Sequence, residues 1–453
     1  MRRDGRQAVS TKCPNSKPAF YAGVTAHLII TDSRNLAGFA LFYNTGMHAT
    51  LIHDWNQAGD PVSKCNVTFD DETLRDGLQS PSVKDPPIEQ KLKILHLMEE
   101  LGIESADIGL PGAGPRAAEH TRRLAKEIAD QHMKIRPNCA ARTVIADVEP
   151  IVRISQDVGI AIEAATFIGS SPIRQYAEDW TLDKVLRISE EAVSYAVKSG
   201  LPVMFVTEDT IRSHPDAICA LYRMAINAGA HALVACDTVG HATPDGVGAL
   251  LGFIRRQVIE PTNKKVRLDW HGHSDRGLSI INSIAAVRAG ADQIHATGLG
   301  IGERVGNTPM DLLLVNLKLM GYIDRDLSRL RDYCFAISEA VEVPIPSNYP
   351  VFGVDAFRTA TGVHAAAVIK ALNKGNTALA NIVYSGVPSH LFGMNQIIEI
   401  GPMSGKSNVI YWLKSRGIAV DDDRVERIFN VAKESDHLLS DEEILSAIGV
   451  TSS

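Results

Sequence analysis

The sequence has few cysteines, no long apolar run and no excess of positive charge. Its six cysteines lie far apart and form no Cys-x-x-Cys pair, which argues against a disulfide framework or a cysteine zinc site and favours a reducing, cytoplasmic location. No stretch reaches the roughly 18 consecutive apolar residues that a membrane-spanning helix needs. The basic start, Met1-Arg2-Arg3, leads into Asp4 rather than into the apolar segment of a secretory signal. We therefore expect a protein that is neither secreted nor inserted in a membrane.

The charge balance is mildly acidic, with 46 Lys and Arg against 53 Asp and Glu and a net charge of −7. Nucleic acid is therefore not expected as the main partner, because phosphate binding needs a basic face. The chain has 453 residues, of which 45% are hydrophobic. That is ample for a buried core, and the length allows about three domains or one large barrel with additions.

Residues 1–60 show no sustained pattern, because Gly, Asn, Ser and Thr interrupt every apolar run. We interpret them as a partly ordered N-terminal extension. A small separate domain is the alternative.

A repeating pattern begins at residue 65, where short runs typical of strands alternate with helical stretches. One such stretch has apolar residues at Ile88, Leu92, Leu95, Met98 and Leu101, a single helical stripe that Gly102 ends. The runs number eight: Asn66–Phe69, Ser105–Gly109, Lys134–Asn138, Ala161–Phe167, Pro202–Val206, Ala232–Cys236, Val266–Trp270 and Asp292–Ala296.

Eight strand–helix units predict an α/β fold, a (β/α)₈ TIM barrel, over residues 65–320. The rival fold is a doubly wound open sheet, which would need a glycine-rich phosphate turn after its first strand. The acidic segment that begins at Asp71 is not such a turn. After the barrel, residues 321–453 read as a mostly helical region, with helices over 322–342 and 415–436 and a proline-rich linker over 344–350.

In such barrels the active site lies where the strands end, so reactive side chains just after the strands are informative. Asp76 follows the first strand, and His271 and His273 follow the seventh. Two histidines at i and i+2 of an extended segment point to the same side. Together with the carboxylate they predict a divalent-metal site with positions open for water and substrate. A surface histidine pair is the alternative. The mixed nitrogen and oxygen ligands favour Mn²⁺ or Zn²⁺ and leave Mg²⁺ open.

Other strand ends carry polar groups as well. Arg75 adjoins Asp76, and a glycine-rich loop, Gly298–Asn307, follows the eighth strand. Glu208 after the fifth strand could act as a general base, and Thr238 after the sixth could donate to a carboxylate. By pattern alone, either residue could equally be a helix cap or part of a turn.

These motifs resemble those of the metal-dependent acyl-CoA condensing enzymes and lyases. The segment Asp71–Gln79 is similar to the D-x-T-L-R-D-G signature of the 2-isopropylmalate, homocitrate and citramalate synthases and the hydroxymethylglutaryl-CoA lyases. Asp237–Gly240, His271–Gly277 and Gly300–Asn307 look like further motifs of the same family in the same order. The resemblance covers roughly residues 65–320 and continues more weakly to about 436.

The resemblance implies that Asp76, His271 and His273 hold the metal and that Arg75 stabilises the developing enolate or alkoxide. The implied reaction is a Claisen-type condensation of acetyl-CoA with a 2-oxo acid, followed by thioester hydrolysis. A 2-isopropylmalate synthase-like acyltransferase is the first expectation. Homocitrate, citrate or citramalate synthesis, or lyase-type C–C cleavage, is the alternative.

The same resemblance assigns the remaining site residues. Gln79 would lie near the 2-oxo acid, and Thr238 would bind its carboxylate. Glu208 would be a catalytic acid or base. The segment 357–364 resembles one that synthases have and lyases lack, and its His364 would reach into the site of a neighbouring subunit, so that a homodimer is implied.

The chain departs from the family pattern at several positions. Leu299 stands where many members carry an Asn metal ligand, although homocitrate synthases similarly have Leu. Ala165, Arg174 and Ser274 replace two histidines and an asparagine of other members. The stretch after Gly405 is too short for the leucine-sensing domain of many isopropylmalate synthases, so we expect that domain to be absent. A non-catalytic ligand-sensing barrel is disfavoured, because Arg75 and the proposed metal ligands are all present.

Overall fold

The computed structural model describes residues 51–52, 55–58 and 66–450. The predicted N-terminal extension, residues 1–60, lies almost wholly outside the described residues. Within it, only Leu51–Ile52 and a short 3₁₀ helix, η1 (Trp55–Ala58), are described.

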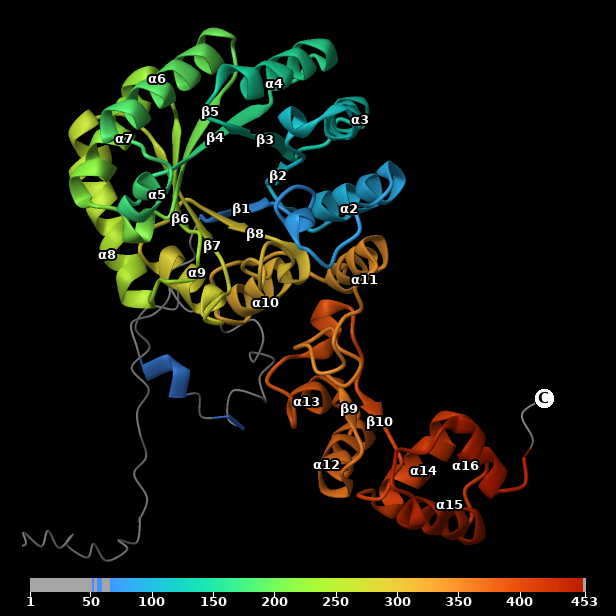
Figure 1. Ribbon diagram of the computed structural model, residues 1–453. Coiled ribbons are helices and arrows are strands. Elements are labelled where there is room, and N and C mark those ends of the chain that lie inside the picture. Colours follow the sequence, from blue (N-terminus) through green and yellow to red (C-terminus); the bar gives the residue numbers. More distant parts are fainter. Residues whose placement is uncertain (1–50, 53–54, 59–65, 451–453) are drawn as a thin grey trace, which may run out of the picture.

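Eight parallel strands close into a barrel in sequence order, which confirms the predicted fold (Figure 1). β1 closes the ring by pairing with both β2 and β8, with Phe69 opposite Ile294. The strands overlap all eight predicted runs: β1 (Thr68–Asp71), β2 (Ser105–Asp107), β3 (Arg136–Arg142), β4 (Glu163–Gly169), β5 (Val203–Glu208), β6 (Ala232–Asp237), β7 (Arg267–Gly272) and β8 (Gln293–Ala296).

Helices surround the barrel and, except for the short α5, which has no buried residue, present apolar residues to the sheet. In α2 the predicted stripe is buried at Leu95 and Met98, and Gly102 follows the helix with a φ of +71°. The helices of this ring are α2 (Ile88–Glu100), α3 (Pro115–Asp130), α4 (Ile145–Val158), α5 (Pro172–Ala177), α6 (Leu182–Lys198), α7 (Pro215–Ala228), α8 (Pro244–Ile254), α9 (Ser279–Arg288) and α10 (Met310–Leu319). No helix in the described part of the chain is long and apolar enough to cross a membrane.

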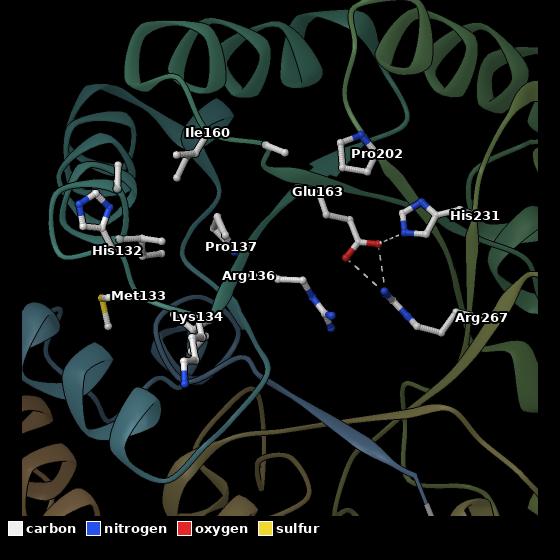
Figure 2. A pocket seen from close by; sticks show the side chains of 14 residues that line it. His132, Met133, Lys134, Arg136, Pro137, Ile160, Glu163, Pro202, His231 and Arg267 are labelled. Carbon is white, nitrogen blue, oxygen red and sulfur yellow. Dashed lines mark hydrogen bonds and ion pairs between the residues drawn. The ribbon is translucent and has the colours of Figure 1, made fainter.

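Charged side chains fill much of the barrel interior. At the amino-terminal ends of the strands, Glu163 forms ion pairs with His231 and Arg267, and Figure 2 shows these three side chains facing one another. They line a cavity of about 730 Å³, which contains none of the residues singled out as site residues. Arg267 also pairs with the buried Asp269, so the polar contacts continue from this cavity toward the middle of the barrel.

The region after the barrel is mostly helical, as predicted, with one small sheet that the sequence did not suggest. Two residues of β9 pair in parallel with two of β10. The last three helices have a small core of their own around Trp412 and Ile428. The elements are α11 (Leu330–Val341), β9 (Arg358–Thr359), α12 (Gly362–Asn373), α13 (Thr377–Ile382), β10 (Ile397–Ile398), α14 (Lys406–Ser415), α15 (Asp422–Glu434) and α16 (Asp441–Ala447).

Both predicted helices of this region are shorter than expected. The helix over 322–342 begins only at Leu330, because the Asp326 side chain accepts the N–H of Ser328 and forms a turn instead. The stretch 415–436 contains one helix that starts at Asp422, after Asp421 caps it by accepting the N–H of Arg424. A side chain that bonds to nearby backbone competes with the helix and sets its boundary.

Helix α11 attaches this region to the barrel. It packs against α2, and its Tyr333 hydroxyl donates to Asp71 Oδ2 at 2.5 Å and lies 3.2 Å from Thr73 Oγ1. Gly298 permits the approach, because a Cβ there would lie 2.6 Å from the Tyr333 oxygen. All three polar groups are buried, so the contact fixes α11 to the end of β1.

We expect Tyr333→Phe to lower the free energy of unfolding by about 1–3 kcal/mol, because it leaves Oδ2 of the buried Asp71 carboxyl without its donor. Urea denaturation of the purified protein measures this. Tyr176→Phe is the control: Tyr176 is 87% exposed, and its loss should change stability by less than about 0.5 kcal/mol. Equal stability of the two variants would mean that the Tyr333 contact does not hold α11.

Candidate active site

Three of the predicted side chains meet at the carboxyl ends of β1 and β7. Asp76 lies in the turn after β1, His271 in the last part of β7, and His273 just beyond it. The Nε2 atoms of the two histidines are 3.1 Å apart, and Asp76 Oδ2 lies 3.8 Å from the first and 3.9 Å from the second. All three residues are buried.

This arrangement fits a divalent cation. Metal–ligand bonds of about 2.0–2.2 Å place neighbouring ligand atoms roughly 3–4 Å apart, which is the spacing found here. Asp76 Oδ2 is buried and has no hydrogen-bond donor among the residues that the structure describes, as expected of an oxygen kept for a cation. Burial and the neighbouring His271 lower the pKa of His273 to about 4, so its imidazole is neutral, as a ligand must be.

A second carboxylate, Glu72, lies behind the triad and was not singled out from the sequence. Its Oε2 is 2.8 Å from His271 Nδ1, and its Oε1 is 3.0 Å from Nδ1 of His295 on β8. Despite burial, the two imidazoles hold the pKa of Glu72 well below its usual range. The sequence shows only an acidic residue at a strand end, a pattern that fits a solvent-exposed side chain equally well.

Three carboxylates hold Arg75 in the same mouth. Its Nε donates to Asp107 Oδ2 at 2.6 Å, and its terminal nitrogens lie 3.1 Å from Asp76 Oδ1 and 3.3 Å from Glu72 Oε1. Burial raises the pKa of Asp107 to about 7, against the opposing pull of Arg75. The guanidinium is thus fixed in direction beside the cation site.

Glu208 reaches the mouth from the end of β5, where it lies opposite Gly169 of β4. Burial raises the pKa of its carboxyl, while the positive charges of Arg174 and Arg75 act in the opposite direction. Arg174 crosses directly over Gly169, since a Cβ there would lie 2.2 Å from Arg174 Cγ. A carboxylate of raised pKa near the triad suits a proton acceptor.

The other predicted residues are less closely associated with the triad. The Thr238 hydroxyl accepts the N–H of Asp209 at 2.8 Å and donates to none of the described residues, so its own proton is available to a ligand. Gln79 is exposed in η2 (Gly77–Gln79), the turn after Asp76. His364 is an exposed residue of α12, packed on Tyr384 with ring centres 4.2 Å apart. Figure 1 shows α12 in the C-terminal region, apart from the strands of the barrel.

The glycine-rich loop folds tightly beside the histidines. Gly306 has a φ of +91°, and a Cβ there would lie 1.8 Å from the Gly300 carbonyl oxygen, so no other residue fits. Ser274 donates to the Asn307 carbonyl, which joins this loop to the segment after β7. Leu299 has a φ of +57°, a conformation uncommon for leucine.

Sequence comparison relates the chain to condensing synthases. The model of a family described as HMGL-like matches residues 66–334. The homocitrate synthase AksA of Methanopyrus kandleri is 32% identical over 366 residues, which is 80% of this chain and 86% of the relative. The 2-isopropylmalate synthase of Sulfurisphaera tokodaii is 31% identical over 82% of this chain and 91% of its own length. A putative (R)-citramalate synthase, CimA of Methanopyrus kandleri, is 31% identical over 84% of this chain and 71% of its own.

Comparison with solved structures supports the fold. The HMG-CoA lyase of Bacillus subtilis superposes with a TM-score of 0.52 at 21% identity, covering 64% of this chain and 97% of the lyase. The hydroxymethylglutaryl-CoA lyase of Pseudomonas aeruginosa gives a TM-score of 0.51 at 18% identity, covering 62% of this chain and 94% of that one.

Removing a residue of the triad should remove the cation. We expect Asp76→Asn and His271→Ala to lower Mn²⁺ or Zn²⁺ affinity by well over tenfold, because losing a group that only supports a ligand already costs about 10–100-fold. Metal analysis of the purified proteins and calorimetric titration measure this. His96→Ala, on the outer helix α2, should keep its metal. An Asp76→Asn protein with its full metal content would contradict the assignment.

Proposed function

This chain belongs to the HMGL-like family, and we propose that it is a condensing synthase of that family, an acyltransferase that joins acetyl-CoA to a 2-oxo acid with the help of a divalent cation. The convergence of Asp76, His271 and His273 at one mouth of the barrel, with Arg75 and Glu208 beside them, is the observation that carries the proposal. We propose a cytoplasmic location, as the cysteine pattern suggests.

The 2-oxo acid would bind at the carboxyl ends of the strands. The free hydroxyl proton of Thr238 would donate to its carboxylate, and Gln79 would lie at the rim of the same site. The triad would hold Mn²⁺, Zn²⁺ or Mg²⁺, and when bound this ion supplies the Lewis acidity that makes the keto carbon electrophilic. Asp76 and the two histidines leave further coordination positions to water and substrate.

Glu208 would carry out the proton transfer. Its carboxylate would take a proton from the methyl group of acetyl-CoA, and the resulting enolate would attack the keto carbon. Arg75, held by its carboxylate partners, would stabilise the negative charge that develops on the keto oxygen. Water would then hydrolyse the thioester and release CoA and a 2-hydroxy acid with one more carboxylate than the 2-oxo acid.

We propose that His364 completes this proton relay from a second copy of the chain. In the single chain its imidazole packs on Tyr384 and has no contact with Glu208 among the described residues. A homodimer that brings α12 over the neighbouring barrel would supply it, and the exposure of His364 is compatible with that role.

A synthase is favoured over a lyase by the extent of the similarities. The relatives that match 80–84% of this chain in sequence, at 31–32% identity, are named synthases, whereas the lyase structures, at 18–21% identity, share the fold alone. A 2-isopropylmalate synthase-like reaction is our first proposal, and homocitrate, citrate or citramalate formation is the alternative. Arg174, a cation near Glu208, would suit a 2-oxo acid with a second carboxylate.

Free thiol should therefore appear when acetyl-CoA is mixed with the protein, a divalent cation and the right 2-oxo acid. We expect release with one of 2-oxoisovalerate, 2-oxoglutarate, pyruvate or oxaloacetate, and loss of release when a chelator removes the ion. A thiol-reactive dye follows the reaction. A rate of thiol release that changes neither with the 2-oxo acid nor with the chelator would contradict the proposal.

Replacing Glu208 should greatly lower the rate of the reaction without changing how much metal the protein binds. We expect Glu208→Gln to lower kcat by about 10²–10⁴-fold with unchanged metal content, the range for a lost acid or base. In the wild type, activity should rise with pH as the Glu208 carboxyl loses its proton, at a pKa above the usual range for glutamate, and the variant should lack this limb. Glu191→Gln, on the exposed side of α6, is the control. A variant that loses its metal would make Glu208 a ligand or a structural residue instead.

A further inference from the structure

The carboxylate of Glu72 lies between two imidazoles in the barrel interior. Its Oε2 is 2.8 Å from His271 Nδ1 and its Oε1 is 3.0 Å from His295 Nδ1, and only 4% of the residue is exposed. The contact with His271 is an ion pair without aligned hydrogen-bond geometry, so Oε2 has no hydrogen-bond donor among the described residues.

The two nitrogens of His271 face different partners. Nδ1 faces Glu72, whereas Nε2 faces His273 and Asp76. An ionised carboxylate only accepts hydrogen bonds, so it favours a proton on Nδ1 and leaves the Nε2 lone pair for a cation. The other histidine of the triad has no such support within the described part of the chain, where its buried Nδ1 finds no hydrogen-bond partner.

His295 places a second imidazole against Glu72. Its Nε2 lies 3.5 Å from Asp269 Oδ2, and its Nδ1 lies 3.6 Å from Asp70 Oδ2. Three carboxylates therefore surround this imidazole, and the Glu72 carboxylate is held between two histidines inside the barrel.

Glu72 could also be a ligand itself, because it forms a second triad with His271 and His295 whose atoms would suit an ion. The distance of 2.8 Å argues against this, since atoms bound to one ion at about 2.1 Å are rarely closer than roughly 3 Å. A direct carboxylate–imidazole contact fits better.

We propose that Glu72 is the positioning residue of the cation site: it holds His271 with the proton on Nδ1 and directs Nε2 toward the ion shared with Asp76 and His273. The inference rests on the cation site of the proposed function. It concerns metal binding alone, so it does not depend on which reaction the protein catalyses.

The test compares the same substitution at two barrel glutamates. Glu72→Gln should weaken Mn²⁺ binding about 10–100-fold in a calorimetric titration without substrate, since a glutamine amide has one oxygen and would face one of the two imidazoles with its NH₂ group instead of a carboxylate oxygen. Glu163→Gln is the matched control, because Glu163 is likewise buried and paired with an imidazole, His231, and with Arg267. It should lose stability, measured as a lower Tm, and keep wild-type Mn²⁺ affinity.

The wild-type protein supplies a second readout that needs no variant to fold. In ¹⁵N-histidine NMR of the Zn²⁺-bound protein, His271 should show a protonated Nδ1 and a ligating Nε2. Unchanged Mn²⁺ affinity in Glu72→Gln, or zinc on Nδ1 of His271, would overturn the proposal. If the wild type binds Mn²⁺ as expected but releases no thiol from acetyl-CoA, the proposed function fails while the role of Glu72 stands.

Discussion

The site depends on the convergence of three ligand groups, the Asp76 carboxylate and the imidazoles of His271 and His273. The closed barrel makes the meeting possible, because parallel pairing brings the ends of β1, β8 and β7 side by side although they are far apart in the sequence. A buried carboxylate oxygen without a donor is costly. Asp76 Oδ2 is such an oxygen among the described residues, and a bound cation would supply the partner that it lacks.

Pairing of charged groups extends through the barrel, from the site to the amino-terminal ends of the strands. From the cavity at the amino-terminal ends, contacts pass from Glu163 to Arg267, to Asp269, to His295 and on to Glu72 and His271. Each acidic group in this series of contacts is adjacent to a basic one, and such pairing allows a barrel to bury many ionisable groups. Glu72 is the member of this series that contacts His271, a histidine of the site.

Sequence reasoning located the strands and the triad because both leave local signals. Short β-rich runs recur at regular spacing, and two histidines at i and i+2 after a strand have few structural explanations. The sequence pattern does not identify Glu72 and Asp107 as site residues, because an acidic residue at a strand end has the same pattern whether it is buried in a barrel or solvated. Their roles depend on partners from other strands, which sequence spacing does not reveal.

The C-terminal region was harder to predict for a different reason. Side chains such as Asp326 and Asp421 set the helix starts through local hydrogen bonds, against an otherwise helical pattern. The short sheet between β9 and β10 joins residues that are distant in sequence. The role proposed for His364 requires a second copy of the chain, so the sequence pattern of one chain does not place its side chain opposite Glu208.

Anomalous diffraction from crystals of the Zn²⁺-loaded protein tests the central claim most directly. The account predicts one strong peak about 2.0–2.2 Å from Asp76 and from Nε2 of both His271 and His273. A peak between Glu72 and His295, or no peak at the mouth of the barrel, would contradict it.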